Sequence, residues 1–113
     1  MAVETIELTE AIWKTAKRLE GGANAITKKA KEYATAEKEY RIALSKEIIK
    51  LKTQGMSVTL IPDLARGNTA ELKFKRDLAA ETYKSSKIML DALSNELSAM
   101  QSILKIQERI ESN

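Results

Sequence analysis

Residues 55–68 read Gly-Met-Ser-Val-Thr-Leu-Ile-Pro-Asp-Leu-Ala-Arg-Gly-Asn, and this stretch decides how the rest of the chain can fold. It holds the only proline and two of the four glycines among 113 residues. Long runs rich in Ala, Leu, Ile, Lys and Glu lie on both sides, and such runs favour helices with narrow apolar stripes. We therefore expect residues 55–68 to be the bend of a helical hairpin or a small recognition element carried on one.

Apolar residues at alternating spacings of three and four predict a helix on each side of this stretch, at residues 24–53 and 69–111. Gly55 is expected to end the first of them in a left-handed conformation, and Asn68 with Glu71 resembles a capping box for the second. The predicted seam before the bend is Ile26, Ala30, Tyr33, Glu37, Tyr40, Leu44, Glu47 and Leu51. After the bend it is Leu72, Arg76, Ala79, Tyr83, Ser86, Leu90, Leu93, Leu97, Met100, Leu104 and Gln107. A second stripe widens the apolar surface towards the C-terminus at Met89, Ala92, Ile103, Ile106 and Ile110.

The N-terminal part predicts a further helix at residues 4–20, with an apolar stripe at Leu8, Ile12, Ala16 and Leu19. Gly21-Gly22 follows, and two glycines cost about 2 kcal/mol of helix propensity relative to alanine, so we expect a break or hinge there. The helix over residues 24–53 is about 45 Å long and covers only part of the longer helix after the bend. Either the first helix runs on past the glycines to cover the rest, or it folds back and another subunit covers it.

The predicted fold is all-α, with residues 1–113 forming one domain. It is a long antiparallel, coiled-coil-like helical hairpin with an extra N-terminal helix, assembled into an oligomeric bundle. Long helices with narrow stripes bury a small fraction of their surface, so stability is expected to depend on a homo-oligomer. The residues expected to mediate this self-association are Leu97, Met100, Leu104, Ile106 and Ile110.

The bend itself is long and apolar for a solvated loop. One interpretation makes it a contact for a partner, through Met56, Val58, Leu60 and Ile61. The other makes it a tip that folds onto the adjoining helices, with residues 62–67 forming one helical turn. Residues 51–61 also resemble the turn of helix-turn-helix proteins, but Pro62 removes a backbone N–H where the second helix of that motif needs one.

Basic residues concentrate around the bend. Residues 41–76 hold eight Lys/Arg against three acids, whereas residues 1–10 and 91–113 are acidic. A patch of this kind can bind phosphates of a nucleic acid, and the alternative is a solvated basic face balanced by the acidic ends. The residues expected to contact a partner or nucleic acid are Lys50, Lys52, Arg66, Lys73, Lys75 and Arg76.

Polar residues interrupt the predicted seams at Glu37, Glu47, Arg76, Ser86 and Gln107. They form either a buried polar site or a set of contacts that fixes the register of the helices, for example with Glu47 facing Arg76.

The chain has neither histidine nor cysteine, which removes the commonest general base and the thiol nucleophile. We therefore expect no enzyme activity, no metal and no cofactor. The first residues lack the basic and apolar regions of a signal peptide, and no window is long enough for a transmembrane helix. The sequence thus predicts a cytoplasmic protein without a membrane partner.

Residues 32–44, 61–67 and 72–77 carry a resemblance to small helical proteins encoded by phages and prophages of Gram-positive bacteria. The most specific parts are Asp-Leu-Ala-Arg-Gly at 63–67 and Leu-Lys-Phe-Lys-Arg-Asp at 72–77. The resemblance covers residue 30 to about residue 110 and implies an origin in a bacterial host cell, with no established activity. Members of the group tend to come from replication or recombination regions. The expected function is a non-enzymatic accessory protein that binds itself and a host or phage protein; the alternative is a nucleic-acid-binding protein that uses the basic tip.

Overall fold

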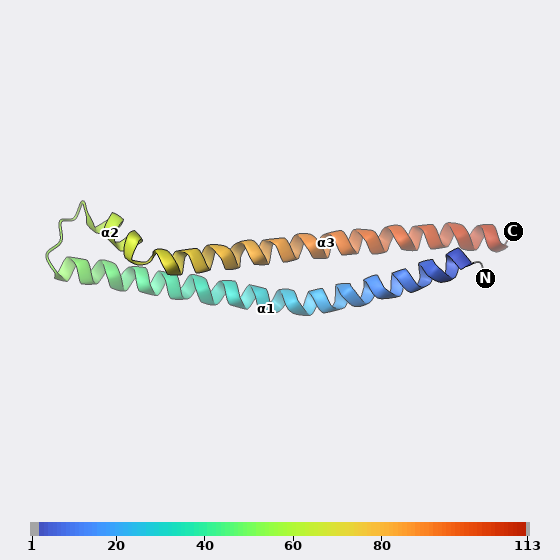
Figure 1. Ribbon diagram of the computed structural model, residues 1–113, viewed down its shortest axis with the longest axis horizontal. Helices are drawn as coiled ribbons and strands as arrows, with labels where there is room; N and C mark the ends of the chain where they lie inside the picture. The colour runs from blue at the N-terminus through green and yellow to red at the C-terminus, as the bar shows by residue number, and fades with distance from the viewer. Residues whose placement is uncertain (1–2, 113) are drawn as a thin grey trace. The chain divides into compact units, whose positions relative to one another are not determined.

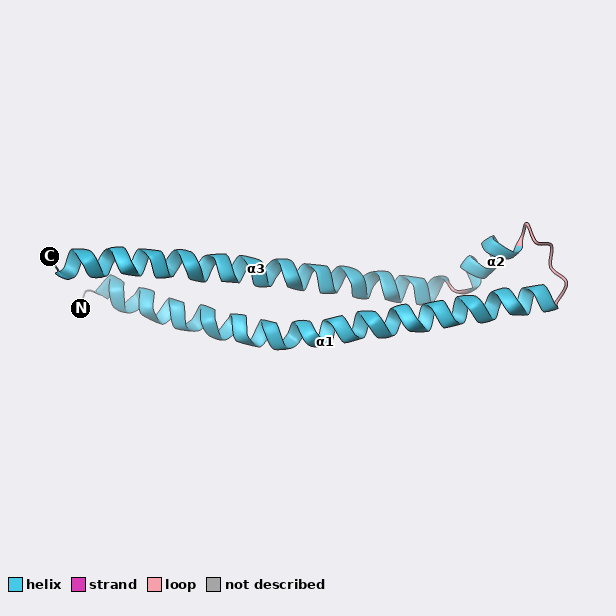
Figure 2. Ribbon diagram, turned by 180° about the vertical axis from the view of Figure 1, so that it is seen from behind, coloured by secondary structure: helices cyan, strands magenta, loops and turns pink. Residues whose placement is uncertain are grey.

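The computed structural model describes residues 3–112 and contains three helices in that range (Figure 1). They are α1 (Val3–Thr53), α2 (Ile61–Asn68) and α3 (Ala70–Ser112), and the described residues contain no strand (Figure 2). Segments of α1 and α3 pack against each other in antiparallel directions. The predicted all-α helical hairpin is therefore confirmed.

Contacts within the chain divide it into two compact units. Unit 1 consists of Met1–Thr27 and Ser85–Asn113, and unit 2 consists of Lys28–Lys84. Each unit contains a stretch of α1 and a stretch of α3, and unit 2 also contains the bend and α2.

The expected break at Gly21-Gly22 is absent, because α1 is one continuous helix from Val3 to Thr53. The prediction of two separate helices over residues 4–20 and 24–53 is wrong, and the alternative in which the helix runs on is correct. At Gly22, α1 passes close to α3: a Cβ there would overlap Cδ2 of Leu90, so a larger residue requires the end of that side chain to move. Contacts with α3 in unit 1 thus offset the low helix propensity of glycine.

The side of α1 that is buried in unit 1 follows a seven-residue repeat. Its buried or half-buried positions include Thr5, Leu8, Ile12, Thr15, Leu19, Gly22 and Ile26. Ala16, which the sequence placed in the stripe, is exposed, and Thr15 takes that place at 5% exposure. The 4-4-3 spacing assumed for the first helix was wrong because a 3-4 alternation keeps the seam on one side of a helix packed along a partner.

On α3 the predicted seam is confirmed, since all eleven of its residues from Leu72 to Gln107 are buried or half-buried. Leu93 is the most deeply buried of them at 7% exposure.

The bend in unit 2 begins with a glycine cap. Gly55 has φ +75°, and two backbone hydrogen bonds close the end of α1 around it. Gly55 N donates to Lys52 O and Met56 N donates to Leu51 O, both at 3.0 Å. This is the paired-bond arrangement of a Schellman motif, in which a left-handed glycine satisfies the last carbonyls of a helix. The predicted role of Gly55 is confirmed.

Helix α2 folds back onto the end of α1. Pro62 lies in its first turn, where no helical N–H bond is lost, and Ile61 and Ala65 are buried against Leu51. Leu44, Ile48 and Met56 pack around these three residues. The interpretation of the tip as a segment packed on the adjoining helix is therefore confirmed, with a helix longer than the single turn expected.

The predicted capping box at the start of the last helix does not form. Asn68 is the final residue of α2, and its side-chain amide donates a hydrogen bond to Glu47 Oε1 at 2.7 Å. Thr69 separates α2 from α3, and its hydroxyl donates to the carbonyl of Ala65 at 2.7 Å. Helix α3 accordingly begins at Ala70.

Candidate interaction surfaces

An exposed apolar stripe follows α3 through unit 1, beside the seam. Its large residues are 63% (Met89), 48% (Ile103), 56% (Ile106) and 69% (Ile110) exposed. Ala92, Glu96 and Ala99 lie between these large residues on the same side of the helix. Together the residues follow alternating spacings of three and four, which is the pattern of a second helix-packing seam. We call this set the α3 stripe: Met89, Ala92, Glu96, Ala99, Ile103, Ile106 and Ile110.

The residues expected to mediate self-association divide between this stripe and the seam. Leu97, Met100 and Leu104 are half-buried in the seam within unit 1. Ile106 and Ile110 belong to the α3 stripe and are exposed. Of the five, Ile106 and Ile110 are therefore the most exposed, and Met89 and Ile103 of the stripe predicted beside the seam add further exposed apolar surface.

Each end of the α3 stripe borders a hollow in unit 1. Near Met89 there is a hollow of about 290 Å³, lined by Arg18, Gly22, Ala25, Ser86, Met89, Leu90 and Leu93. Near Ile110 there is one of about 220 Å³, lined by Glu4, Thr5, Gln107, Ile110 and Glu111. Thr5, which lines the second hollow, is buried, and its hydroxyl donates to Glu111 Oε1 at 2.6 Å.

The tip residues also divide into two groups. Ile61 is 4% exposed and Met56 is half-buried, and both belong to the packing of α2 on α1. Val58 is 79% and Leu60 is 52% exposed. Val58 also lines a groove of about 340 Å³, together with Tyr40, Leu44, Ile48, Lys52, Ile61, Pro62, Ala65 and Arg66. Val58 and Leu60 are thus the tip residues that can contact a partner.

All six predicted basic contact residues lie in unit 2, and half of them already have acidic partners. Arg66 pairs with Asp63 at 3.4 Å, Lys75 pairs with Glu39 at 3.5 Å, and Arg76 has two partners described below. The remaining three, Lys50, Lys52 and Lys73, are exposed and form no ion pair within residues 3–112. Unit 2 holds 13 Lys/Arg against 8 Asp/Glu, whereas unit 1 holds 6 against 8.

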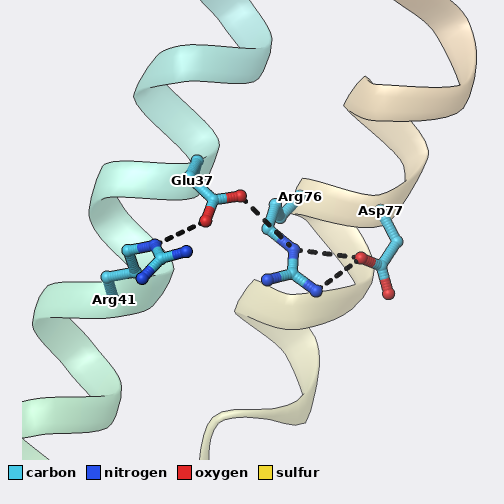
Figure 3. A network of polar contacts seen from close by, with 4 residues as sticks. All are labelled: Glu37, Arg41, Arg76 and Asp77. Atoms are coloured by element: carbon cyan, nitrogen blue, oxygen red, sulfur yellow. Dashed lines mark hydrogen bonds and ion pairs between the residues drawn. The ribbon is translucent and has the colours of Figure 1, made fainter. Parts of the chain in front are cut away.

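Arg76 lies at the centre of a polar network across the seam of unit 2 (Figure 3). Its Nε and Nη2 donate to Asp77 Oδ1 at 3.0 and 2.8 Å, and its Nε lies 3.8 Å from Glu37 Oε2. Glu37 Oε1 also accepts a hydrogen bond from Arg41 on the next turn of α1. The guanidinium carbon lies 4.6 Å from the ring centroid of Tyr40, which is cation–π distance.

The predicted pairing of Glu47 with Arg76 is wrong, since Glu47 accepts from Asn68 and Arg76 pairs with Glu37. The network supports the interpretation that polar seam residues fix helix register, because it joins named positions on α1 and α3. The hydrogen bond to Asp77 raises the pKa of Arg76 above its ordinary value. A raised pKa means that the stabilising charge is present at all lower pH, so the Arg76 contribution is constant through the neutral range.

Polar seam residues in unit 1 are also paired or packed. Gln107 Oε1 lies 3.4 Å from the Thr5 hydroxyl, and Ser86 is half-buried beside the hollow near Met89. Neither residue forms a separate buried polar site.

Residues 3–112 contain no group of three or more Asp, Glu, His or Cys side chains placed to hold a metal ion. Within the same residues, no helix is long and apolar enough to cross a membrane.

Comparison of the chain with protein-family models, with curated proteins and with solved structures gives no match. The fold and the surfaces define an all-α helical hairpin with an exposed apolar stripe on α3.

Proposed function

We propose that the chain is a non-enzymatic accessory protein that acts by self-association and by binding another protein. The observation that carries this proposal is the α3 stripe. Exposed apolar residues in a continuous helix-packing register mark interaction surfaces, whereas single exposed apolar residues are ordinary on any protein. The phage or prophage origin and the cytoplasm of a bacterial host belong to the same proposal and rest on the sequence resemblance.

Self-association through the stripe can be tested with one charge. Ile106→Glu places a carboxylate in the middle of the stripe without disturbing the seam, because Ile106 is 56% exposed. Light scattering coupled to gel filtration is expected to show a loss of dimer mass. Leu78→Glu is the matched control, since Leu78 is on the same helix and 57% exposed but lies outside the stripe. The proposal would be overturned if the Ile106→Glu variant associates to the same mass as the unmodified protein does. It would also be overturned if the unmodified protein is a monomer.

Binding of another protein is assigned to the tip. Val58 and Leu60 are exposed, and Val58 lines an apolar groove together with Lys52 and Arg66. A complementary partner presents apolar side chains next to acidic ones. Proteins retained by the immobilised chain should be lost with Val58→Ser/Leu60→Ser, which leaves the Leu51–Ile61–Ala65 cluster intact. If the retained proteins do not change, the tip is not the contact.

Nucleic-acid binding is the second candidate, favoured by the three unpaired lysines and the net charge of +5 in unit 2. Fluorescence anisotropy with short single- and double-stranded DNA tests it at low and moderate salt. Binding should weaken as the salt concentration rises. The slope of log affinity against log salt concentration should become shallower in the triple variant Lys50→Ala/Lys52→Ala/Lys73→Ala, by about one for each phosphate that is no longer neutralised. Absence of binding at low salt would eliminate this candidate.

A further inference from the structure

We infer that the α3 stripe is covered by the α3 stripe of a second copy, and that the two helices run antiparallel and cross at Ala99. This inference rests on the proposed self-association and adds its register. Three observations lead to it: the order of residues along the stripe, the one charge within it, and the hollows at its two ends.

The stripe has a centre of near symmetry. In an antiparallel pair centred on Ala99, Ala99 meets its own copy, Ala92 lies level with Ile106 of the second copy, and Met89 lies within about one residue of the level of Ile110. Ala92 thus faces a large residue of the second copy, and the two copies of Ala99 allow the helices to approach closely at the crossing. A parallel pair would instead place Ile106 against Ile106 and Ala92 against Ala92.

Charge favours the same direction. In the antiparallel pair, Glu96 of the stripe lies level with Ser102 of the second copy, which carries no charge. In a parallel pair Glu96 would face Glu96 across the contact, and such like charges are destabilising.

The hollows match the ends of the stripe. The antiparallel register brings Ile110 of the second copy to the hollow beside Met89, and Met89 of the second copy to the hollow beside Ile110. Gly22 and Ala25 line the first hollow, so small residues of α1 leave room for the entering side chain. Each hollow then receives one large apolar side chain.

Single cysteines test the register, because the chain has no cysteine of its own. Under mild oxidation, Ala99→Cys should form an intermolecular disulfide, because the two sulfurs meet at the crossing. On a non-reducing denaturing gel the protein should then move from the monomer band to the dimer band. Ala92→Cys alone should stay monomeric. Ala92→Cys mixed with an Ile106→Cys chain that carries a mass tag should give the mixed dimer.

The outcomes separate this inference from the proposed function. Sedimentation is measured on the same samples before oxidation. A dimer in which Ala92→Cys cross-links to itself is parallel, and a dimer in which none of these cysteines cross-links uses another face. Either result overturns the antiparallel register and leaves self-association standing. A chain that sediments as a monomer overturns both.

Discussion

In unit 1, the Cβ that residue 22 lacks would overlap Cδ2 of Leu90 and lie 3.5 Å from its Cγ. Gly22 and Leu90 therefore mark a point at which α1 and α3 pack backbone against side chain. The neighbouring Gly21 has nothing within 4 Å of the same position. One glycine of the pair is thus a packing residue, and the other is not.

This difference predicts different effects of alanine at the two positions. Gly21→Ala should raise the free energy of unfolding by about 1 kcal/mol, because helix propensity improves and nothing is displaced. Gly22→Ala should raise the free energy of unfolding by less than Gly21→Ala does, or should lower it, because the end of the Leu90 side chain must move. Thermal and urea unfolding followed by circular dichroism measure both. If both variants raise the free energy of unfolding equally, the close approach of Leu90 to Gly22 does not affect stability.

A second pair of glycines tests the bend. Gly55 has φ +75°, where a side chain costs about 1–2 kcal/mol, so Gly55→Ala should destabilise the protein by about that amount. Gly67 lies within α2 at ordinary helical φ with open space around it, and Gly67→Ala should stabilise by up to about 1 kcal/mol. Chemical denaturation compares the two. A neutral Gly55→Ala would mean that the left-handed cap is dispensable.

The packing of α2 on α1 depends on one side chain. Ile61 is 4% exposed, and Ile61→Ala should lower the free energy of unfolding by about 2–4 kcal/mol. Leu60→Ala is the control at the preceding residue, which is 52% exposed, and its effect should be within about 0.5 kcal/mol. Similar losses for both variants would indicate that α2 is not held by this cluster.

Glu96 is the only charged residue of the α3 stripe. A carboxylate in an apolar contact between helices opposes association because it loses water there. Glu96→Ala should therefore tighten the dimer, seen as a lower dissociation constant in sedimentation equilibrium. Glu108→Ala, also on α3 in unit 1 but outside the stripe, should leave the constant unchanged. A weaker dimer for Glu96→Ala would place Glu96 in a favourable polar contact.

The α3 seam could be predicted from the sequence because its 3-4 spacing is unbroken from Leu72 to Gln107. The continuity of α1 could also be predicted from the sequence. An apolar or aromatic residue recurs every seven residues and keeps the same phase across Gly21-Gly22, at Ile12, Leu19, Ile26, Tyr33 and Tyr40. Propensity alone suggested a break there. Propensity is a weak guide where a helix packs along a partner, and the seven-residue phase was the better indicator.

The partners of the polar seam residues could not be predicted in the same way. They depend on where α3 begins alongside α1, and α2 determines that by occupying the surface around Leu51. Asn68 therefore lies beside Glu47, and Arg76 lies beside Glu37. The sequence showed which residues are polar within the seams but not the offset between them. Likewise, it identified the six basic residues around the tip but not that three of them have acidic partners.

Sedimentation equilibrium of the unmodified chain at micromolar concentration tests the central claim most directly. A covered α3 stripe predicts a dimer, with twice the chain mass of 12.6 kDa and a monomer fraction that grows on dilution. A species that keeps the mass of 12.6 kDa at all concentrations would contradict it.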